Sequence, residues 1–315
     1  MSKRFAWLAL PAAFFVTSFA GAATKSFTTA SSSLPQETEI VATSNVKSVR
    51  SAETFKKLFP QLLKLDKEAP DALAKFKKTC GIDPVTAIDD VTVGLNASDE
   101  GAFFVALNGV TEKKLIECAT KLAKEDKETL TATKTGNITE LKSDTGDSVY
   151  FAWLSENVLV LTTDPDEKPL LEKWIGGKGT LAKSKVGGRL AKIKDDAALS
   201  VVFTKEIPID SSMTIKGGDF TLSVKSAVLD IVTTLEMSSS KEADSLVAAA
   251  KALTSLLPIP KDAPKELEKI LKSLNATSKG AEATITASAA EKDIIAVANW
   301  ALGSVTKKAA KPATP

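Results

Sequence analysis

The sequence has no histidine among its 315 residues. Histidine is the commonest general base, the commonest zinc ligand and the side chain that titrates near neutral pH. Its absence excludes Ser-His-Asp and Cys-His catalytic arrangements and the His-Glu-x-x-His zinc site. Only chemistry that works without imidazole, such as a Ser/Lys pair or paired carboxylates, stays open to this chain.

Arginine and aromatic side chains are also scarce. Arginine occurs only as Arg4, Arg50 and Arg189, and Tyr150 is the single tyrosine. Arginine is the usual bidentate partner of phosphate and carboxylate groups, and aromatic rings form the stacking platforms of base-binding sites. The 41 basic side chains nearly balance the 39 acidic ones. Since a nucleic-acid partner requires a concentrated positive surface, none is expected.

The N-terminal segment is typical of a secretory signal peptide. Lys3 and Arg4 precede an apolar run that ends in small residues, and Ala22 or Ala23 fits the cleavage site. The run is shorter than the roughly 20 apolar residues that a membrane span needs. We expect residues 1–22 to be removed and the product to be exported, as a periplasmic or extracellular protein without a membrane span.

The chain has only two cysteines, Cys80 and Cys118. In an oxidising compartment the pairing of two cysteines is the default. Apolar residues recur in steps of three and four around each cysteine, which places both on the buried stripes of predicted helices. We therefore expect a disulfide that joins two helices, and two buried, unpaired thiols are the alternative.

The composition, with 43% hydrophobic residues, is typical of a globular protein. Amphipathic periodicity and cap residues predict helices at 52–65, 71–80, 111–126, 167–175, 241–257, 265–274 and 292–305. Alternating runs between turn residues predict strands at 39–49, 90–96, 102–108, 130–135, 138–143, 148–154, 158–163, 198–206, 213–216, 220–224, 228–236 and 282–288. The predicted class is α+β, with antiparallel sheets and amphipathic helices packed on one face.

Composition also predicts how the chain is divided. The Ser/Thr-rich segment 23–36 is expected to be a flexible leader, and the Lys/Ala/Pro-rich segment 307–315 a disordered tail. Between them we expect a first α+β unit at 37–197 and a second at 198–306. The order strand, strand, helix occurs in both units, which suggests an internal duplication.

Ser-x-x-Lys, a spacing used by some hydrolases, occurs three times. About three matches are expected by chance in this composition, and no companion motif accompanies them. The matches are Ser44/Lys47, Ser238/Lys241 and Ser304/Lys307.

Two further segments have simpler structural explanations. The Gly-rich segment 176–180 lacks the spacing of a phosphate-binding loop and predicts a helix stop. The acidic segment 164–167 could be proposed as a metal site, but it better fits a helix start, with Asp164 as the N-cap and Pro165 at the first helical position. The sequence thus predicts no catalytic, cofactor-binding or metal-binding residue.

An antiparallel sheet covered by helices can leave a cavity between the two layers. We interpret the bulky side chains first as core residues and second as the lining of such a cavity. The candidates are Phe103, Phe104, Leu107, Phe151, Trp153, Trp174 and Trp300.

Three segments, 80–84, 88–94 and 104–109, read Cys-Gly-Ile-Asp-Pro, Ile-Asp-Asp-Val-Thr-Val-Gly and Phe-Val-Ala-Leu-Asn-Gly. This pattern resembles one in uncharacterised exported proteins of myxobacteria and related bacteria, over the first half of the mature chain. The resemblance implies an envelope location and a duplicated α+β fold, and it transfers no functional residue.

Three functions of different classes follow. The first is a non-enzymatic envelope or secreted protein that binds a protein or surface partner. The second is a periplasmic carrier of a lipid or another apolar small molecule, which predicts a lined pocket between sheet and helices. The third is a hydrolase with a Ser/Lys or carboxylate site, which requires such residues to converge in a cleft.

Overall fold

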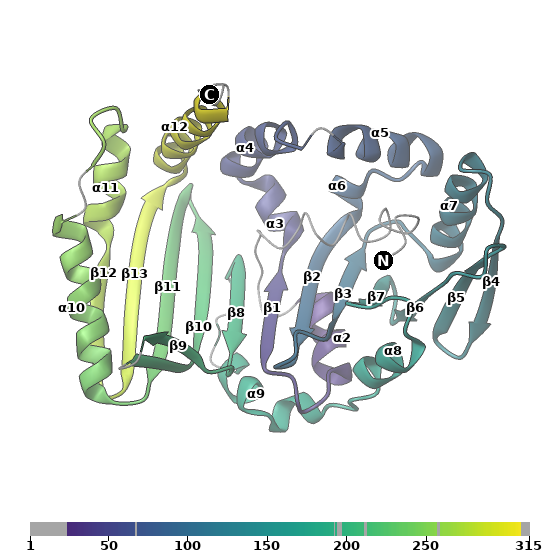
Figure 1. Cartoon of the computed structure of the whole chain (residues 1–315), viewed down its shortest axis with the longest axis horizontal. Helices are drawn as coiled ribbons and strands as arrows, with labels where there is room; N and C mark the ends of the chain where they lie inside the picture. Colours follow the sequence, from purple (N-terminus) through teal and green to yellow (C-terminus); the bar gives the residue numbers. More distant parts are fainter. Residues whose placement is uncertain are drawn as a thin grey trace, which may run out of the picture. The chain divides into compact units, whose positions relative to one another are not determined.

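The computed structural model describes residues 24–66, 68–191, 193, 197–210, 213–256 and 259–309 (Figure 1). The expected signal peptide lies outside this range. The fold is α+β with antiparallel strand pairing, which confirms the predicted class. The chain forms two compact units: the first contains the described residues up to Ser48 and Asp66–Lys205, and the second contains Val49–Leu65 and those from Glu206 onward. The second unit thus includes a helix that the sequence had placed in the first.

The first unit is built on strands in the order β8-β1-β2-β3-β7-β6-β5-β4 (Figure 1). The strands are β1 (Ile40–Ser44), β2 (Ile88–Leu95), β3 (Gly101–Leu107), β4 (Leu130–Thr135), β5 (Ile138–Ser143), β6 (Ser148–Leu154), β7 (Val158–Thr162) and β8 (Leu199–Phe203). The helices are α2 (Lys25–Ser33), α5 (Ala69–Cys80), α6 (Pro84–Ala87), α7 (Glu112–Glu125), α8 (Lys168–Ile175), the 3₁₀ helix η2 (Thr180–Lys183) and α9 (Lys185–Leu190). Helix α3 (Val46–Ser51) crosses the boundary to the second unit.

Both faces of this sheet are buried. On β3, Phe104 and Ala106 belong to a core cluster with α2, α8 and α9, whereas Val105 and Leu107 belong to a second cluster with α5, α6 and α7. Successive side chains of a strand point to opposite faces, so an unbroken apolar strand requires a cover on each side. Helices therefore pack on both faces of this sheet, and not on one face as the sequence suggested.

The additional cover comes from α2, in the segment that was predicted to be a flexible leader. That prediction is wrong from Thr24 onward: Ser26, Ala30 and Leu34 are fully buried against the sheet. Thr24 is the N-cap of α2 and accepts a hydrogen bond from the backbone N–H of Phe27. Small side chains on the buried face let the helix approach the sheet closely.

The fully buried hydroxyl group of Ser26 on α2 bonds to a partner on the strands. The Oγ of Ser26 lies 2.9 Å from Oγ1 of Thr92, which lies 2.9 Å from Oγ1 of Thr43. The backbone N–H of Ser26 donates to the buried carboxylate of Asp90 at 2.7 Å. Hydrogen bonds of this kind remove the desolvation cost of buried polar groups. The Ser/Thr-rich segment thus forms a helix of the core.

The C-terminal end of α2 is capped by the Gly-rich segment. The backbone N–H groups of Gly177 and Gly179 donate to the carbonyl oxygens of Ser33 and Ser32, each at 2.7 Å. These carbonyls would otherwise lack partners at the helix end. The predicted helix stop is present, since α8 ends at Ile175. The same glycines also cap the C-terminal end of α2.

The second unit has strands in the order β12-β13-β11-β10, and β9 pairs with β10. Its core is small: Ala243 and Val247 of α10 pack on Met237, Ala276 and Ala283. Its elements are α4 (Glu53–Leu63), β9 (Ile207–Asp210), β10 (Met213–Lys225), β11 (Val228–Met237), α10 (Ser240–Leu256), α11 (Lys265–Ser273), β12 (Asn275–Lys279), β13 (Glu282–Ala290) and α12 (Glu291–Ala309). Residues 307–309 of the predicted tail form the last turn of α12, and 310–315 lie outside the described residues.

Side chains of helices α4 and α12 form hydrogen bonds with each other. The backbone N–H and the hydroxyl of Thr54 donate to Oε2 of Glu291 at 2.7 and 2.9 Å. Gln61 donates to the side-chain oxygen of Asn299 at 2.9 Å. Within the described part of the chain, every helix is too short or too polar to cross a membrane.

Two local differences from the predicted elements have clear causes. The first strand ends at Ser44, because the side chain of Asn45 accepts from the backbone N–H of Ser48 and starts α3. The predicted helix start at Asp164 is wrong: α8 begins at Lys168, with Glu167 as its N-cap. The carbonyl of Pro165 accepts from the N–H of Tyr150 at 2.6 Å, so this segment extends the strand pairing.

Candidate functional site

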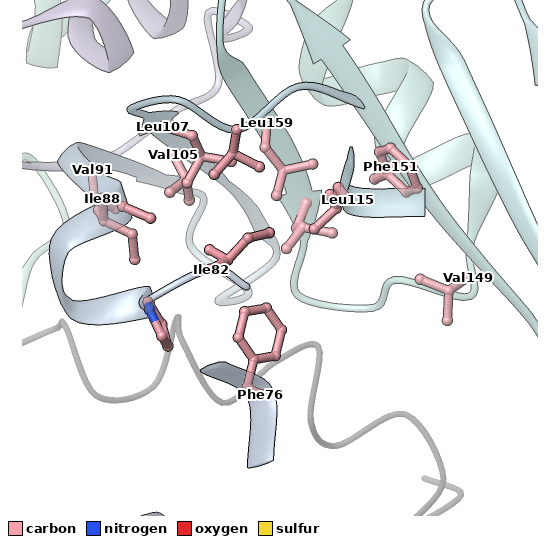
Figure 2. A pocket seen from close by; sticks show the side chains of 14 residues that line it. Phe76, Ile82, Ile88, Val91, Val105, Leu107, Leu115, Val149, Phe151 and Leu159 are labelled. Carbon is pink, nitrogen blue, oxygen red and sulfur yellow. The ribbon is translucent and has the colours of Figure 1, made fainter. Parts of the chain in front are cut away.

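An apolar pocket of about 80 Å³ lies in the first unit, between the sheet and the layer of α5, α6 and α7. Figure 2 shows its lining, with the ring of Phe76 directed toward the aliphatic side chains around Ile82. All of the lining residues except Phe76 and Leu161 are buried. They are Phe76, Ile82, Pro84, Ala87, Ile88, Val91, Val105, Leu107, Val110, Leu115, Val149, Phe151, Leu159 and Leu161.

Side chains on alternate positions of β3 and β7 form one wall of the pocket. Val105 and Leu107 are two residues apart on β3, and Leu159 on β7 pairs directly with Val105. All three side chains therefore point to the same face of the sheet. The opposite wall comes from the helices, with Phe76 on α5 and Leu115 on α7.

The lining contains no polar side chain, so the pocket suits a hydrocarbon group and disfavours a polar one. Apolar cavities of about 150 Å³ stay dry and bind benzene. This pocket has about half that volume, which fits the end of an alkyl chain. An unfilled cavity of 80 Å³ costs about 2 kcal/mol at ~24 cal/mol per Å³, and a ligand recovers part of this.

A disulfide joins the two helices that carry Phe76 and Leu115. Cys80 is the last residue of α5, Cys118 lies in the middle of α7, and their Cα atoms are 4.7 Å apart. Both cysteines belong to the core cluster beneath the pocket. The pairing expected from the sequence is the one present.

Asp83 fixes the short helix α6 at the edge of the pocket. Its Oδ1 accepts from the backbone N–H of Val85 at 3.1 Å, and its Oδ2 accepts from Lys77 at 2.7 Å. The hydrogen bond from Lys77 holds the pKa of the Asp83 carboxyl below its usual value, with a smaller contribution from the charge of Lys77, while partial burial opposes the shift.

We expect Asp83→Ala to lower the free energy of unfolding at pH 7 by about 1 kcal/mol, because an N-cap is lost. The folded pKa lies below the unfolded value of ~3.9, so the carboxylate stabilises the fold above pH ~4 and loses this effect as the pH falls through the folded pKa. Urea unfolding at pH 7 and pH 3 measures the difference. A penalty that is equal at both pH values would contradict this account.

Of the seven side chains that the sequence offered as a lining, Leu107 and Phe151 line the pocket. Phe103 and Trp153 pack beside this cluster, Phe104 and Trp174 belong to the core on the other face of the sheet, and Trp300 is in the second unit. Ile82, Pro84 and Ala87 also line the pocket and were not among the predicted lining residues. The signal was the presence of Ile82, Pro84 and Ala87 in a connection between helix and strand, since such connections are usually polar and exposed.

The structure describes both side chains of two Ser-x-x-Lys matches. Ser44 is buried and Lys47 exposed. Ser238 and Lys241 are both exposed, while the side chain of Ser304 lies outside the described set. Among the described residues, no group of three or more Cys, Asp and Glu could hold a metal ion.

No protein-family model and no curated protein matches the chain. Among solved structures, the chain is similar to crystal forms I, III and IV of TP0453, a treponemal protein, at 10% sequence identity. The matches cover 84–85% of this chain and 95–96% of TP0453, with TM-scores of 0.45–0.47.

Proposed function

We propose that the first unit binds the hydrocarbon part of a small molecule, as a carrier of a lipid or another apolar compound. The observation that supports the proposal is the pocket between sheet and helices, whose lining from Phe76 to Leu161 is wholly apolar. Buried apolar area stabilises such a complex by about 25 cal/mol per Å². The proposal places the polar end of the ligand outside the pocket, where water solvates it.

The pocket gives a direct test with cis-parinaric acid, a fatty acid whose fluorescence rises in an apolar environment. Ala87 lines the pocket, so Ala87→Leu adds a side chain into the space. We expect this variant to bind the probe at least about tenfold more weakly, since a ~1.4 kcal/mol loss of contact gives that factor. A fluorescence titration measures the dissociation constant.

Ala132→Leu is the matched control, because Ala132 is exposed on β4 in the same unit. It makes the same change outside the pocket and should bind as the wild type does. Circular dichroism shows that both variants are folded. Equal affinity of Ala87→Leu and wild type would place the probe elsewhere and refute the proposal.

A second candidate function is the binding of a protein partner. It is favoured by Leu62 and Leu65 at the end of α4, which are 47% and 52% exposed. Native mass spectrometry of the protein purified from its own source distinguishes the two candidates. A bound mass of small-molecule size supports the carrier, whereas a bound polypeptide supports the partner.

A further inference from the structure

The pocket reaches solvent beside two of its lining residues. Phe76 on α5 and Leu161 on β7 are partly exposed, and the other lining side chains are buried. Leu161 lies in the sheet, opposite Phe103 of β3. A ligand that enters here must therefore pass the edge of a paired strand or displace the helix that carries Phe76.

The elements around the pocket differ in how firmly they are anchored. Helix α7 buries Leu115, Cys118, Ala119, Leu122 and Ala123. Helix α5 buries only Ala69 at its start and Cys80 at its end. Segments with few buried apolar contacts open at the lowest free-energy cost. The middle of α5 is thus the least anchored part of the lining.

Besides Phe76, which packs on the apolar core cluster, α5 is held to neighbouring elements by polar side-chain contacts near the surface. Lys75 forms ion pairs with Glu125 and Asp126 at 3.7 and 3.1 Å, and all three side chains are 45–56% exposed. Thr79 donates to Glu125 at 2.7 Å, and Lys77 pairs with Asp83. Exposed pairs of this kind stabilise a structure only weakly. They can hold α5 closed and still permit frequent opening.

From this arrangement we infer that α5 is the gate of the pocket and that Phe76 is its closing side chain. The two ends of the helix stay fixed, by the burial of Ala69 and by the disulfide of Cys80. The turns around Phe76 open locally, away from α7, to admit the ligand and re-form behind it. This inference rests on the proposed function, because a gate has a role only where a ligand enters.

A gate controls rates and leaves the equilibrium unchanged when it opens as easily with ligand as without. Lys75→Ala removes contacts that hold the gate closed, and Lys75 does not line the pocket. We expect both the association and the dissociation rate constant of cis-parinaric acid to rise about fivefold, with an unchanged dissociation constant. Stopped-flow fluorescence measures both constants.

Phe76→Ala and Leu161→Ala form a matched pair, since each removes one partly exposed lining side chain. Phe76→Ala should raise the association rate constant at least about fivefold, whereas Leu161→Ala should raise only the dissociation rate constant. If Lys75→Ala and Phe76→Ala associate at the wild-type rate, α5 is not the gate, although binding in the pocket stands. If the wild-type protein does not bind the probe, or Ala87→Leu binds it equally well, the proposed function and the gate both fail.

Discussion

The double substitution Cys80→Ala/Cys118→Ala is expected to lower the free energy of unfolding of the first unit by about 4 kcal/mol. The disulfide closes a loop of 38 residues. In the chain-entropy relation, a cross-link over a loop of this length removes about 13 cal/mol/K from the entropy of the unfolded chain, which is roughly 4 kcal/mol at 25 °C. Few single changes in this unit should cost as much.

Urea unfolding measured by circular dichroism provides the test. The wild-type protein with added dithiothreitol serves as a second form without the bridge, and its midpoint should fall by a similar amount. Substitution to alanine keeps both positions apolar, which matters because Cys118 is only 2% exposed. An unfolding free energy within about 1 kcal/mol of the wild type would show that the loop is already restrained in the unfolded chain.

Much of the first unit could be predicted from residue patterns because its strands are bounded by turn residues. The segments 130–135, 138–143 and 148–154 were predicted as strands and are β4, β5 and β6 without a change of bounds. Helix α7 was predicted from the apolar period around Cys118 and from the cap Thr111, which accepts from the N–H of Lys114. Turn residues, apolar periodicity and helix caps are sufficient to predict helices and strands where the pattern fits only one kind of element.

Helix α2 could not be predicted, because its stability comes from distant partners. Nothing in the sequence next to Ser26 indicates that Asp90 and Thr92, more than sixty positions away, will bond to it. Ser-rich segments without such partners remain solvated. Tertiary hydrogen bonds and close packing therefore override the weak helix propensity of this segment.

A cavity between the sheet and the helices was predicted as an alternative, but most of its lining was not, for a related reason. Leu107 and Phe151 were recognised as bulky strand residues, but the space between layers depends on small differences in how side chains meet. Ala87 leaves room at one position, and the partly exposed ring of Phe76 closes the pocket at another. Sequence patterns identify which residues face a core, and they do not give the volume that those residues leave empty.

The second large effect is expected at Gly177, where Gly177→Ala should lower the free energy of unfolding by about 3 kcal/mol. A Cβ atom at this position would lie 2.3 Å from the carbonyl oxygen of Leu34 and 2.4 Å from that of Ser33. Both are backbone atoms, so no side-chain rotation relieves the clash. The Gly-rich segment or the end of α2 must shift, and the hydrogen bonds that cap α2 would lengthen or break.

Gly188→Ala in α9 is the matched control for this substitution. A Cβ atom there meets no atom within 4 Å, and Gly188 lies inside a helix, where alanine is favoured by about 0.5–1 kcal/mol. Thermal unfolding should therefore show a lower midpoint for Gly177→Ala and an unchanged or higher midpoint for Gly188→Ala. Equal midpoints for the two variants would mean that the contact between the Gly-rich segment and α2 is not formed in solution. A selective loss at Gly177 would instead establish that α2 is part of the folded core, because only a docked α2 brings the carbonyl of Leu34 into contact with this glycine.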